Sequence, residues 1–146
     1  MMQPIEFFAA GDPKGQPRPK AFARGGHAAI YDPGTAEGWK GCIALAGRSF
    51  CPTAPLEMPL RVDLTFYFPR PKSHFRTGKN ASELRDDAAA WHCKKPDRDN
   101  SDKAVLDALT LLRFWRDDSQ VCDGRIQKLY DDGRGPGCLI RISEAL

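Results

Sequence analysis

The chain has 146 residues, of which 41% are hydrophobic and 28% are charged. This length fits one domain, because splitting it would leave two undersized hydrophobic cores, and the composition is that of a globular protein rather than a disordered or fibrous one. No apolar run approaches the ~20 residues that cross a bilayer, and the N-terminus lacks the basic start of a secretory signal. The sequence therefore predicts a single-domain cytoplasmic protein with no membrane partner.

The formal net charge of +3 is unevenly distributed along the chain. Residues 1–96 carry 14 Lys and Arg against 9 Asp and Glu, whereas residues 97–146 carry 8 against 10. An acidic centre in a modestly basic body suits a polyanionic substrate that reaches carboxylates through metal ions. Ordinary solvated charge explains the counts equally well. The five cysteines form no C-x-x-C pair, which favours reduced thiols over disulfides or zinc ligands.

The first third of the chain predicts a strand, a long loop and a helix. Residues 5–10 (IEFFAA) are a short apolar run before a Gly/Pro break, which is typical of a strand. The many glycines and prolines of residues 11–33 predict a long loop without regular structure. From Thr35 to Phe50, apolar residues recur at steps of three and four, which predicts an amphipathic helix with Thr35 as its N-cap. The apolar stripe of this helix is Trp39, Ile43, Ala46 and Phe50.

Two basic loops are candidate DNA-binding segments. A long loop in a small domain is uncommon unless it is functional, and spaced cations near aromatic rings suit a phosphate backbone; a merely solvated loop is the alternative. The second loop, residues 69–95, follows the clearest strand, residues 60–68, in which apolar and polar residues alternate. The candidate DNA-binding cations are Lys14, Arg18, Lys20 and Arg24 in the first loop and Arg70, Lys72, Arg76, Lys79, Lys94 and Lys95 in the second.

The last third of the chain predicts a helix followed by two strands. The helix runs from Asn100 to about Leu112, with Asp99 as its N-cap. Residues 125–130 (RIQKLY) and 138–142 (CLIRI) are predicted strands, and the turn-rich segment between them predicts a hairpin. The core-facing stripe of the helix is Ala104, Val105, Ala108, Leu109 and Leu112.

Acidic residues frame this helix at both ends. Asp97 and Asp99 stand two apart before it, so in an extended segment their carboxylates lie on the same side and can converge on one ion. Lys103 is four residues beyond Asp99, where its ammonium can reach a phosphate held by those acids, and Asp107 is placed to steady it. The acidic pair that follows the far end of the helix is Asp117 and Asp118.

Convergent carboxylates imply a hard divalent cation, because they raise one another's pKa and a cation removes the repulsion. Mg²⁺ prefers one or two carboxylates with water and phosphate oxygens, so the pattern predicts Mg²⁺ or Mn²⁺ and phosphodiester hydrolysis. A structural interpretation stays open, in which Asp99 is only a cap and Asp117 and Asp118 only a polar turn. An EF-hand is disfavoured because Asp102 and Ala108 replace its glycine and glutamate. A phosphatase with an aspartyl nucleophile is disfavoured because KKP, not an apolar strand, precedes the D-x-D.

The segment KKPDRDNSDKAVLDALT followed by FWRDDSQV closely resembles the signature of the RusA family of Holliday-junction resolvases, many of them encoded by phages and prophages. FYFPRPKSHFRTGKN and the early GQPRPK and YDP are also similar to phage members. Family members often have an aliphatic residue after Asn100, where this chain has Ser101 and Asp102, which adds a negative charge. The resemblance assigns the essential acids to Asp97, Asp99 and Asp118, a neighbouring acid to Asp117 and the active-site lysine to Lys103.

The resemblance implies a mixed α+β fold, with a small mixed β-sheet of about four strands and two main helices, in a homodimer. It also implies Mg²⁺-dependent nicking of two opposed strands of a four-way DNA junction, with the metal held by Asp97, Asp99 and Asp118. Symmetry independently favours the dimer, because a junction needs paired cuts and the chain has one acid cluster. Two rival hypotheses stay open: a nuclease for flaps, forks or duplex DNA, and a non-catalytic DNA-binding dimer.

Overall fold

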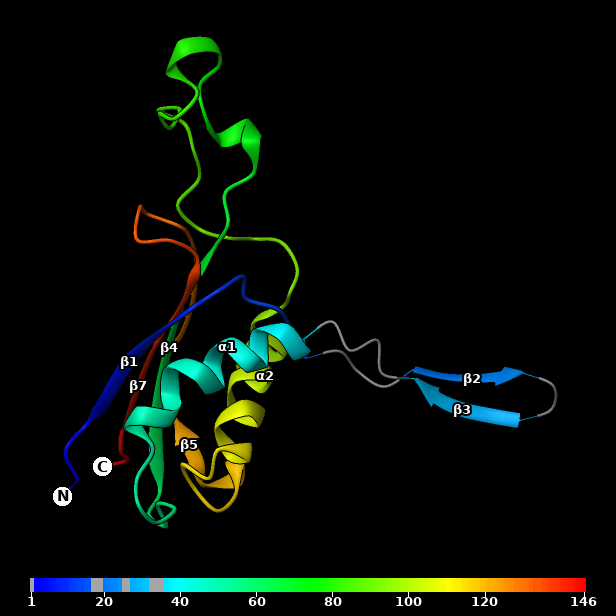
Figure 1. Ribbon diagram of the computed structural model, residues 1–146, viewed down its shortest axis with the longest axis vertical. Helices are drawn as coiled ribbons and strands as arrows, with labels where there is room; N and C mark the ends of the chain where they lie inside the picture. Colours follow the sequence, from blue (N-terminus) through cyan, green and yellow to red (C-terminus); the bar gives the residue numbers. More distant parts are fainter. Residues whose placement is uncertain (1, 17–19, 25–26, 32–35) are drawn as a thin grey trace.

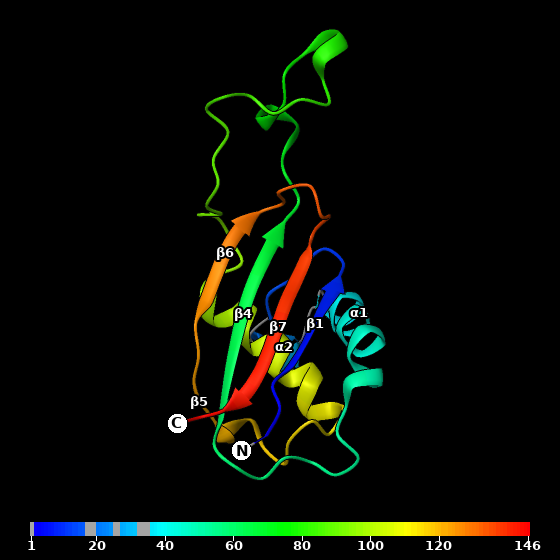
Figure 2. The ribbon, with the colours of Figure 1, turned by 90° about the vertical axis from the view of Figure 1, so that its left-hand side faces the viewer.

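The computed structural model describes residues 2–16, 20–24, 27–31 and 36–146. Five strands form one mixed sheet, and both long helices pack on the same face of it (Figures 1 and 2). The predicted mixed α+β class with two main helices is confirmed, and the sheet has five strands rather than about four. The strands of the sheet are β1 (Ile5–Ala10), β4 (Leu60–Phe68), β5 (Val121–Asp123), β6 (Ile126–Tyr130) and β7 (Gly137–Glu144), and the helices are α1 (Glu37–Gly47) and α2 (Arg98–Leu111).

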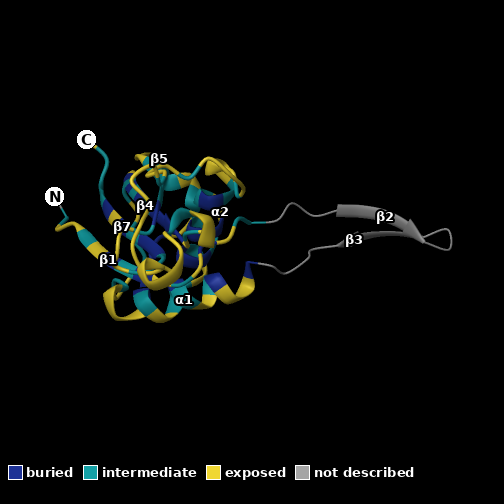
Figure 3. Cartoon of the chain, turned by 90° about the horizontal axis from the view of Figure 1, so that it is seen from above, coloured by how far each residue is buried: buried dark blue, intermediate teal, exposed yellow. Residues whose placement is uncertain are grey.

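Strand β4 is the centre of the sheet. Its residues alternate as predicted, and Leu60, Val62, Leu64 and Phe66 are buried. β7 pairs with one side of β4 in the antiparallel sense, β5 and β6 pair with the other side in the parallel sense, and β1 lies beyond β7. Figure 3 shows the buried residues gathered between the sheet and the helices. Burying a side chain of this size contributes about 1.5–3 kcal/mol, so β4 anchors the core.

Strands β6 and β7 lie on opposite sides of β4, so the predicted terminal hairpin is wrong. β6 pairs with β4 from Ile126 to Tyr130, and β7 pairs with the other side of β4. The connection, residues 131–136, crosses two strand spacings, about 10 Å, which is within its reach. The N–H of Asp131 donates to the carbonyl of Phe68 at 2.8 Å and fixes the start of this connection at the end of β4.

Residues 11–33 are not the irregular loop that the sequence predicts, because β2 (Lys20–Arg24) and β3 (His27–Tyr31) pair with each other in the antiparallel sense. The loop was predicted because glycine and proline are common in loops. In the sequence, however, Gly25 and Gly26 stand between two short runs, and a Gly-Gly pair there is a hairpin signal. Two predicted residues, Arg18 and Thr35, lie outside the described residues.

The two helices bury most of the stripes that the sequence predicts. α1 buries Trp39 and Ile43, whereas Phe50 belongs to a following 3₁₀ turn, η1 (Arg48–Phe50), and is 47% exposed. The N-cap of α1 is Ala36, which makes no side-chain capping bond. No helix of the described residues is long and apolar enough to span a membrane. The buried residues of α2 are Ser101, Ala104, Val105, Ala108 and Leu109, and Leu112 is half-buried just after it.

Residues 69–95 form an arm that extends beyond the end of the sheet (Figure 2). Its helical turns are two short 3₁₀ helices, η2 (Lys72–His74) and η3 (Gly78–Asn80), in keeping with the low periodicity of the sequence. At its base the ring of His92 stacks on that of Phe68, with 3.8 Å between centroids. Burial and the nearby positive charges of Lys128 and Lys94 lower the pKa of His92, so this ring packs as a neutral aromatic.

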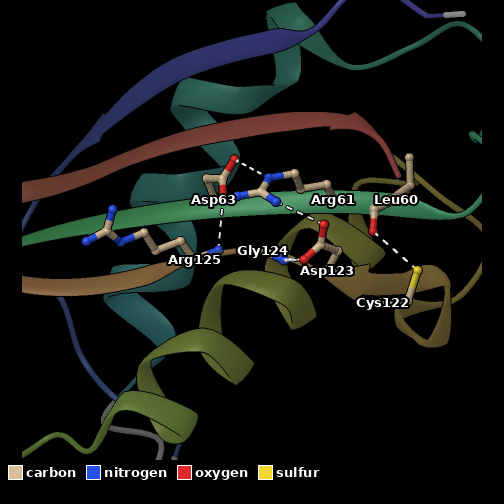
Figure 4. Close-up of polar contacts among 7 residues, drawn as sticks. All are labelled: Leu60, Arg61, Asp63, Cys122, Asp123, Gly124 and Arg125. Atoms are coloured by element: carbon tan, nitrogen blue, oxygen red, sulfur yellow. Dashed lines mark hydrogen bonds and ion pairs between the residues drawn. The ribbon is translucent and has the colours of Figure 1, made fainter. Parts of the chain in front are cut away.

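A charged network holds the sheet edge formed by β5 and β6 against β4 (Figure 4). Arg61 of β4 forms ion pairs with Asp63 at 3.0 Å and with Asp123 of β5 at 2.9 Å. Burial raises the pKa of Asp63, but hydrogen bonds from Arg61 and from the Arg125 N–H outweigh it, so the pKa is lowered overall. Gly124 has φ +147°, and an added Cβ would lie 1.9 Å from a β4 carbonyl oxygen, so this position requires glycine.

Candidate active site

The start of α2 carries the first two candidate acids. The helix begins at Arg98 with Asp97 as its N-cap, so the predicted start at Asn100 and the predicted cap at Asp99 are wrong. The N–H and hydroxyl of Ser101 both donate to the Asp97 carbonyl at 2.9 Å, which closes the first turn earlier than expected. Asp99 is therefore helical and not a same-side neighbour of Asp97 on an extended segment. The Asp97 carboxylate makes no capping hydrogen bond.

Lys103 and Asp107 pair along the outer face of α2. Their Nζ and Oδ1 atoms are 3.5 Å apart, which confirms the contact predicted from the four-residue spacing. Asp107 also lies 3.8 Å from the Nζ of Lys40 on α1, so both helices hold it. The Lys103 side chain is 60% exposed. Exposed pairs of this kind add little stability, and the exposure of the lysine leaves its ammonium accessible to a substrate.

A 3₁₀ turn, η4 (Asp118–Gln120), places the second acidic pair. Asp117 caps this turn by accepting a hydrogen bond from the N–H of Ser119 at 2.9 Å. The side-chain amide of Gln120 also stabilises the turn. Its oxygen accepts hydrogen bonds from the N–H groups of Arg116 and Asp117, at 2.9 and 3.0 Å. Its nitrogen donates to two carbonyls of the segment before β4, at 2.9 and 3.2 Å. Gln120 thus fixes the acidic turn to the body of the protein.

The second acidic pair lies close to the outer face of α2. Burial raises the pKa of Asp118, and a hydrogen bond and the charge of Asp117 raise it further. The ammonium of Lys103 opposes this rise, and the carboxylate of Asp107 adds to it. Such electrostatic effects require proximity. Asp118 therefore lies near α2, the helix that carries Asp99 and Lys103.

Asp102 belongs to the same group of carboxylates. Burial raises its pKa, and the negative charges of Asp118 and Asp99 raise it further, while Arg98 opposes the rise. Asp102 is therefore near both the acid of the first helical turn and the acid of the η4 turn. The group that the structure brings together is Asp99, Asp102, Lys103, Asp107, Asp117 and Asp118, with Asp97 at the helix start.

The chemistry of these donors suits a hard cation. Carboxylate oxygens are the protein ligands that Mg²⁺ prefers, and a divalent cation offsets the repulsion that raises the pKa of Asp102 and Asp118. Among the residues that the structure describes, no group of three or more His, Cys, Asp or Glu is already arranged to hold a metal ion. Coordination by Asp97, Asp99 and Asp118 therefore requires their side chains to converge.

Residues 10–143 match the family model of the endodeoxyribonuclease RusA. The chain belongs to the RusA family. It is 34% identical over 131 residues to a Bacillus subtilis (strain 168) protein named Uncharacterized protein YqaN, which covers 90% of this chain and 91% of YqaN. The crossover junction endodeoxyribonucleases RusA of Escherichia coli (strain K12) and Enterobacteria phage 82 are each 50% identical over 42 residues, 25% of this chain and 35% of theirs. The match to the named RusA enzymes thus spans about a third of their length.

In this RusA-family chain, the start of the first basic segment packs against the start of α2. The N–H of Gln16 donates to the carbonyl of Asn100 at 2.9 Å, and a Cβ at Gly15 would lie 2.7 Å from Pro96. Lys14 is exposed and forms an ion pair at 3.2 Å with an aspartate two residues earlier. A segment remote in sequence therefore lies beside the acids. The other candidate cations of this segment within the described residues, Lys20 and Arg24, are the end residues of β2.

The cations of the arm divide into two sets. Arg70 donates to the carbonyls of Asp131 and Ala89 at 2.8 and 2.7 Å and so attaches the base of the arm. Arg76 forms an ion pair with Asp86 at 3.2 Å. These arginines maintain the shape of the arm. The exposed cations that have no acidic partner among the described residues are Lys72, Lys79, Lys94 and Lys95.

Sequence reasoning missed Gln120 and Trp91, and it noted the negative charge of Asp102 without giving this residue a role in the site. Gln120 stands three residues after Asp117, the spacing of a capping box, and that signal was available. Asp102 stands three residues after Asp99, which places it on the same helical face. Trp91 is 55% exposed beside the start of α2, and its segment shows no periodicity that would have placed it there.

Proposed function

We propose that this protein is a metal-dependent endodeoxyribonuclease that resolves four-way DNA junctions by paired hydrolysis of phosphodiester bonds. Membership of the RusA family over residues 10–143 carries the proposal, and the acids and the lysine of the family pattern are all present. The RusA relatives of Escherichia coli and phage 82 are named crossover junction endodeoxyribonucleases. The mutually repelling carboxylates of α2 and η4 support the same chemistry.

The proposal divides the residues of the site into ligands of a metal ion and residues that support them. A bound divalent ion, Mg²⁺ or Mn²⁺, lowers the pKa of an attacking water and offsets the charge of the reacting phosphate. Asp117 keeps the neighbouring carboxylate in position through the η4 turn. Lys103, steadied by Asp107, presents an ammonium that offsets charge on the phosphate or the leaving oxygen. The residues that hold the ion are Asp97, Asp99 and Asp118.

DNA binding and dimerisation complete the proposal. Exposed lysines of the arm and of the first basic segment contact phosphates, which gives affinity without sequence preference. The chain supplies one group of acids, and two opposed cuts require two, so a homodimer with two-fold symmetry brings a site to each strand.

Replacement of one proposed metal ligand tests the site. On a labelled synthetic four-way junction, the wild type should make symmetric nicks with Mg²⁺ and none in EDTA. Asp99→Asn keeps the shape of the side chain and removes its charge, so we expect junction affinity within about threefold of the wild type. Cleavage should fall by about 100-fold or more, because the residues of a catalytic group act as a unit. Gel shift measures the binding, and a time course of nicking measures the rate.

Two further variants control this experiment. Lys103→Ala should lower the cleavage rate more than the affinity, and Glu37→Gln, an acid in the first turn of α1, should change neither. Wild-type nicking by Asp99→Asn would show that the assigned site is wrong. Faster cleavage of a flap or a duplex than of the junction would favour the rival nucleases. Salt-sensitive binding without metal-dependent nicking would favour a non-catalytic DNA-binding dimer.

A further inference from the structure

A pocket lies between the start of α2 and the sheet edge formed by β6. It has a volume of about 380 Å³, which falls in the range of about 300–1,000 Å³ for small-molecule sites. The residues that line it include one large aromatic residue, two arginines and one glutamine. The lining residues are Trp91, Arg98, Gly124, Arg125, Ile126 and Gln127.

The indole of Trp91 is exposed although its backbone is fixed. The residue is 55% exposed, and it pairs with Leu129 of β6 in an antiparallel bridge. The residues on either side of Trp91 form two further backbone hydrogen bonds with the end of β6, each of 2.9 Å. A fixed backbone lowers the entropy that the residue loses when a ligand covers its ring. Trp91 is therefore suited to stack against a flat partner.

Two exposed arginines supply positive charge to the same pocket. Arg98 and Arg125 are both exposed, and neither forms an ion pair with another described residue. The N–H of Arg125 donates to Asp63 at 2.9 Å, and Figure 4 shows its side chain directed away from that network. The close contact of Gly124 with β4 fixes the same wall. The pocket thus places an exposed indole together with two exposed arginines.

The pocket adjoins the proposed active site. Arg98 stands between Asp97 and Asp99 at the start of α2. A second pocket, of about 300 Å³, shares Gly124 and Ile126 with the first and reaches Asp102. A DNA strand whose phosphate lies at the acids therefore has a neighbouring nucleotide within reach of Trp91.

We propose that this pocket binds one unstacked nucleotide of branched DNA, next to the phosphate that the acids hold; the inference rests on the proposed function. The base stacks on Trp91, and Arg98 and Arg125 bind the phosphate of the same nucleotide. Every base has a π face, so such stacking tolerates any sequence. A base within a duplex must first be unstacked, whereas a base at a branch point is more easily released. The pocket thereby favours branched DNA over plain duplex.

Equilibrium binding in EDTA tests the pocket in the absence of metal-dependent cleavage. A labelled four-way junction and a duplex of the same length are compared at one salt concentration. Trp91→Ala should weaken junction binding about 5- to 100-fold and leave duplex binding within about twofold. Trp91→Phe keeps an aromatic face and should retain most of the junction affinity, which separates loss of stacking from misfolding.

The fluorescence of the indole gives a second measurement. Trp39 and Trp115 are 3% and 0% exposed, so iodide quenching of the tryptophan emission reports mainly on Trp91. Junction binding should protect this residue from iodide, and duplex binding should protect it less. The matched control is Leu111→Ala, which removes a side chain that is 78% exposed at the far end of α2 and should change neither affinity.

The arginine contacts have their own test. Arg125→Ala should weaken junction binding and reduce the slope of log affinity against log salt by about one, as expected for the loss of one phosphate contact. Arg48→Ala, at an exposed arginine of η1, is the matched control and should leave the slope unchanged. An unchanged slope in Arg125→Ala would remove this residue from the proposal.

Two outcomes would overturn the pocket as a nucleotide site. One is an equal weakening of junction and duplex binding by Trp91→Ala, and the other is an indole that stays open to iodide in the junction complex. If the wild type nicks junctions with Mg²⁺ and Trp91→Ala keeps full junction affinity, the pocket inference is wrong but the proposed function stands. If the wild type nicks no DNA, the proposed function fails, and the comparison in EDTA still decides whether Trp91 contacts an unstacked base.

Discussion

Asp102 adds a negative charge beside the acids of the site, and without a cation its neighbours disfavour that charge. Burial and the charges of Asp118 and Asp99 raise its pKa, so the ionised form is disfavoured in the folded protein. Asp102→Asn removes the charge at nearly constant shape. Because like-charge pairs on a helix cost a few tenths of a kcal/mol, we expect the melting temperature in EDTA to rise by roughly 1–3 °C.

The second part of this test measures the effect of Mg²⁺ on the melting temperature. A cation that binds the folded state raises the melting temperature by mass action, and Asp102 contributes one of the charges that attract it. Mg²⁺ should therefore stabilise the wild type more than Asp102→Asn in a thermal melt. Asp86→Asn, at an arm carboxylate that is 96% exposed, should respond to Mg²⁺ as the wild type does. A lower melting temperature of Asp102→Asn in EDTA would contradict the proposed repulsion.

Ser101, which directly follows Asn100, is buried without an unsatisfied polar group. The residue is fully buried, and its hydroxyl donates to the Asp97 carbonyl at 2.9 Å. A buried hydroxyl without a partner would cost free energy, but this one reinforces the first turn of α2. The same bond helps to set the position of Asp97, so a core residue and a candidate metal ligand are structurally coupled.

At the scale of elements, the η4 turn depends on Gln120. Its amide makes four hydrogen bonds with backbone groups, two with N–H groups just before the turn and two with carbonyls of the segment before β4. Gln120→Ala should lower the free energy of unfolding by about 1–3 kcal/mol, since each such bond contributes about 0.5–1.5 kcal/mol and water replaces part of the loss. It should also slow junction cleavage by about tenfold or more, because a small misplacement of Asp118 is costly.

Binding and cleavage of the junction, measured well below the melting temperature, check this prediction. Junction affinity should stay near that of the wild type, because Gln120 is not a proposed DNA contact. Gln3→Ala, at an exposed residue before β1, should change neither stability nor rate. A folded Gln120→Ala protein that cleaves at the wild-type rate would show that the turn does not position Asp118.

The sequence predicted local elements better than their arrangement, because burial shows in a local pattern whereas strand pairing depends on distant residues. β4 was predicted with its boundaries because its alternation reflects burial of one face. The pairing of β6 and β7 with opposite sides of β4 is a long-range choice that no short pattern encodes. The contact of Lys103 with Asp107 follows from helical spacing, whereas the approach of Asp118 to Asp102 depends on the whole turn after α2.

At the scale of the whole molecule, two basic segments adjoin the acids of α2, one directly before the helix in the sequence and one packed against its start. Lys94 and Lys95 end the arm just before the helix, and the segment around Gly15 packs against its first turn. Basic segments next to an acidic site can hold a DNA strand while the acids act on one phosphate. Under the proposed function, one group of acids per chain cuts one strand, so we expect resolution of a junction to require a second chain.

Mixed dimers test this requirement. Differently tagged wild-type and Asp99→Asn chains, co-expressed and purified through both tags, should contain one intact site. On a supercoiled plasmid with an extruded cruciform, two coordinated cuts release linear DNA, whereas one cut leaves a nicked circle. We expect mainly linear product from the wild type and mainly nicked circles from the mixed species. Wild-type chains carrying both tags control for the purification. Linear product from the mixed species, or wild-type protein that sediments as a monomer while bound to a junction, would contradict the dimer, because one acid group would then have cut both strands.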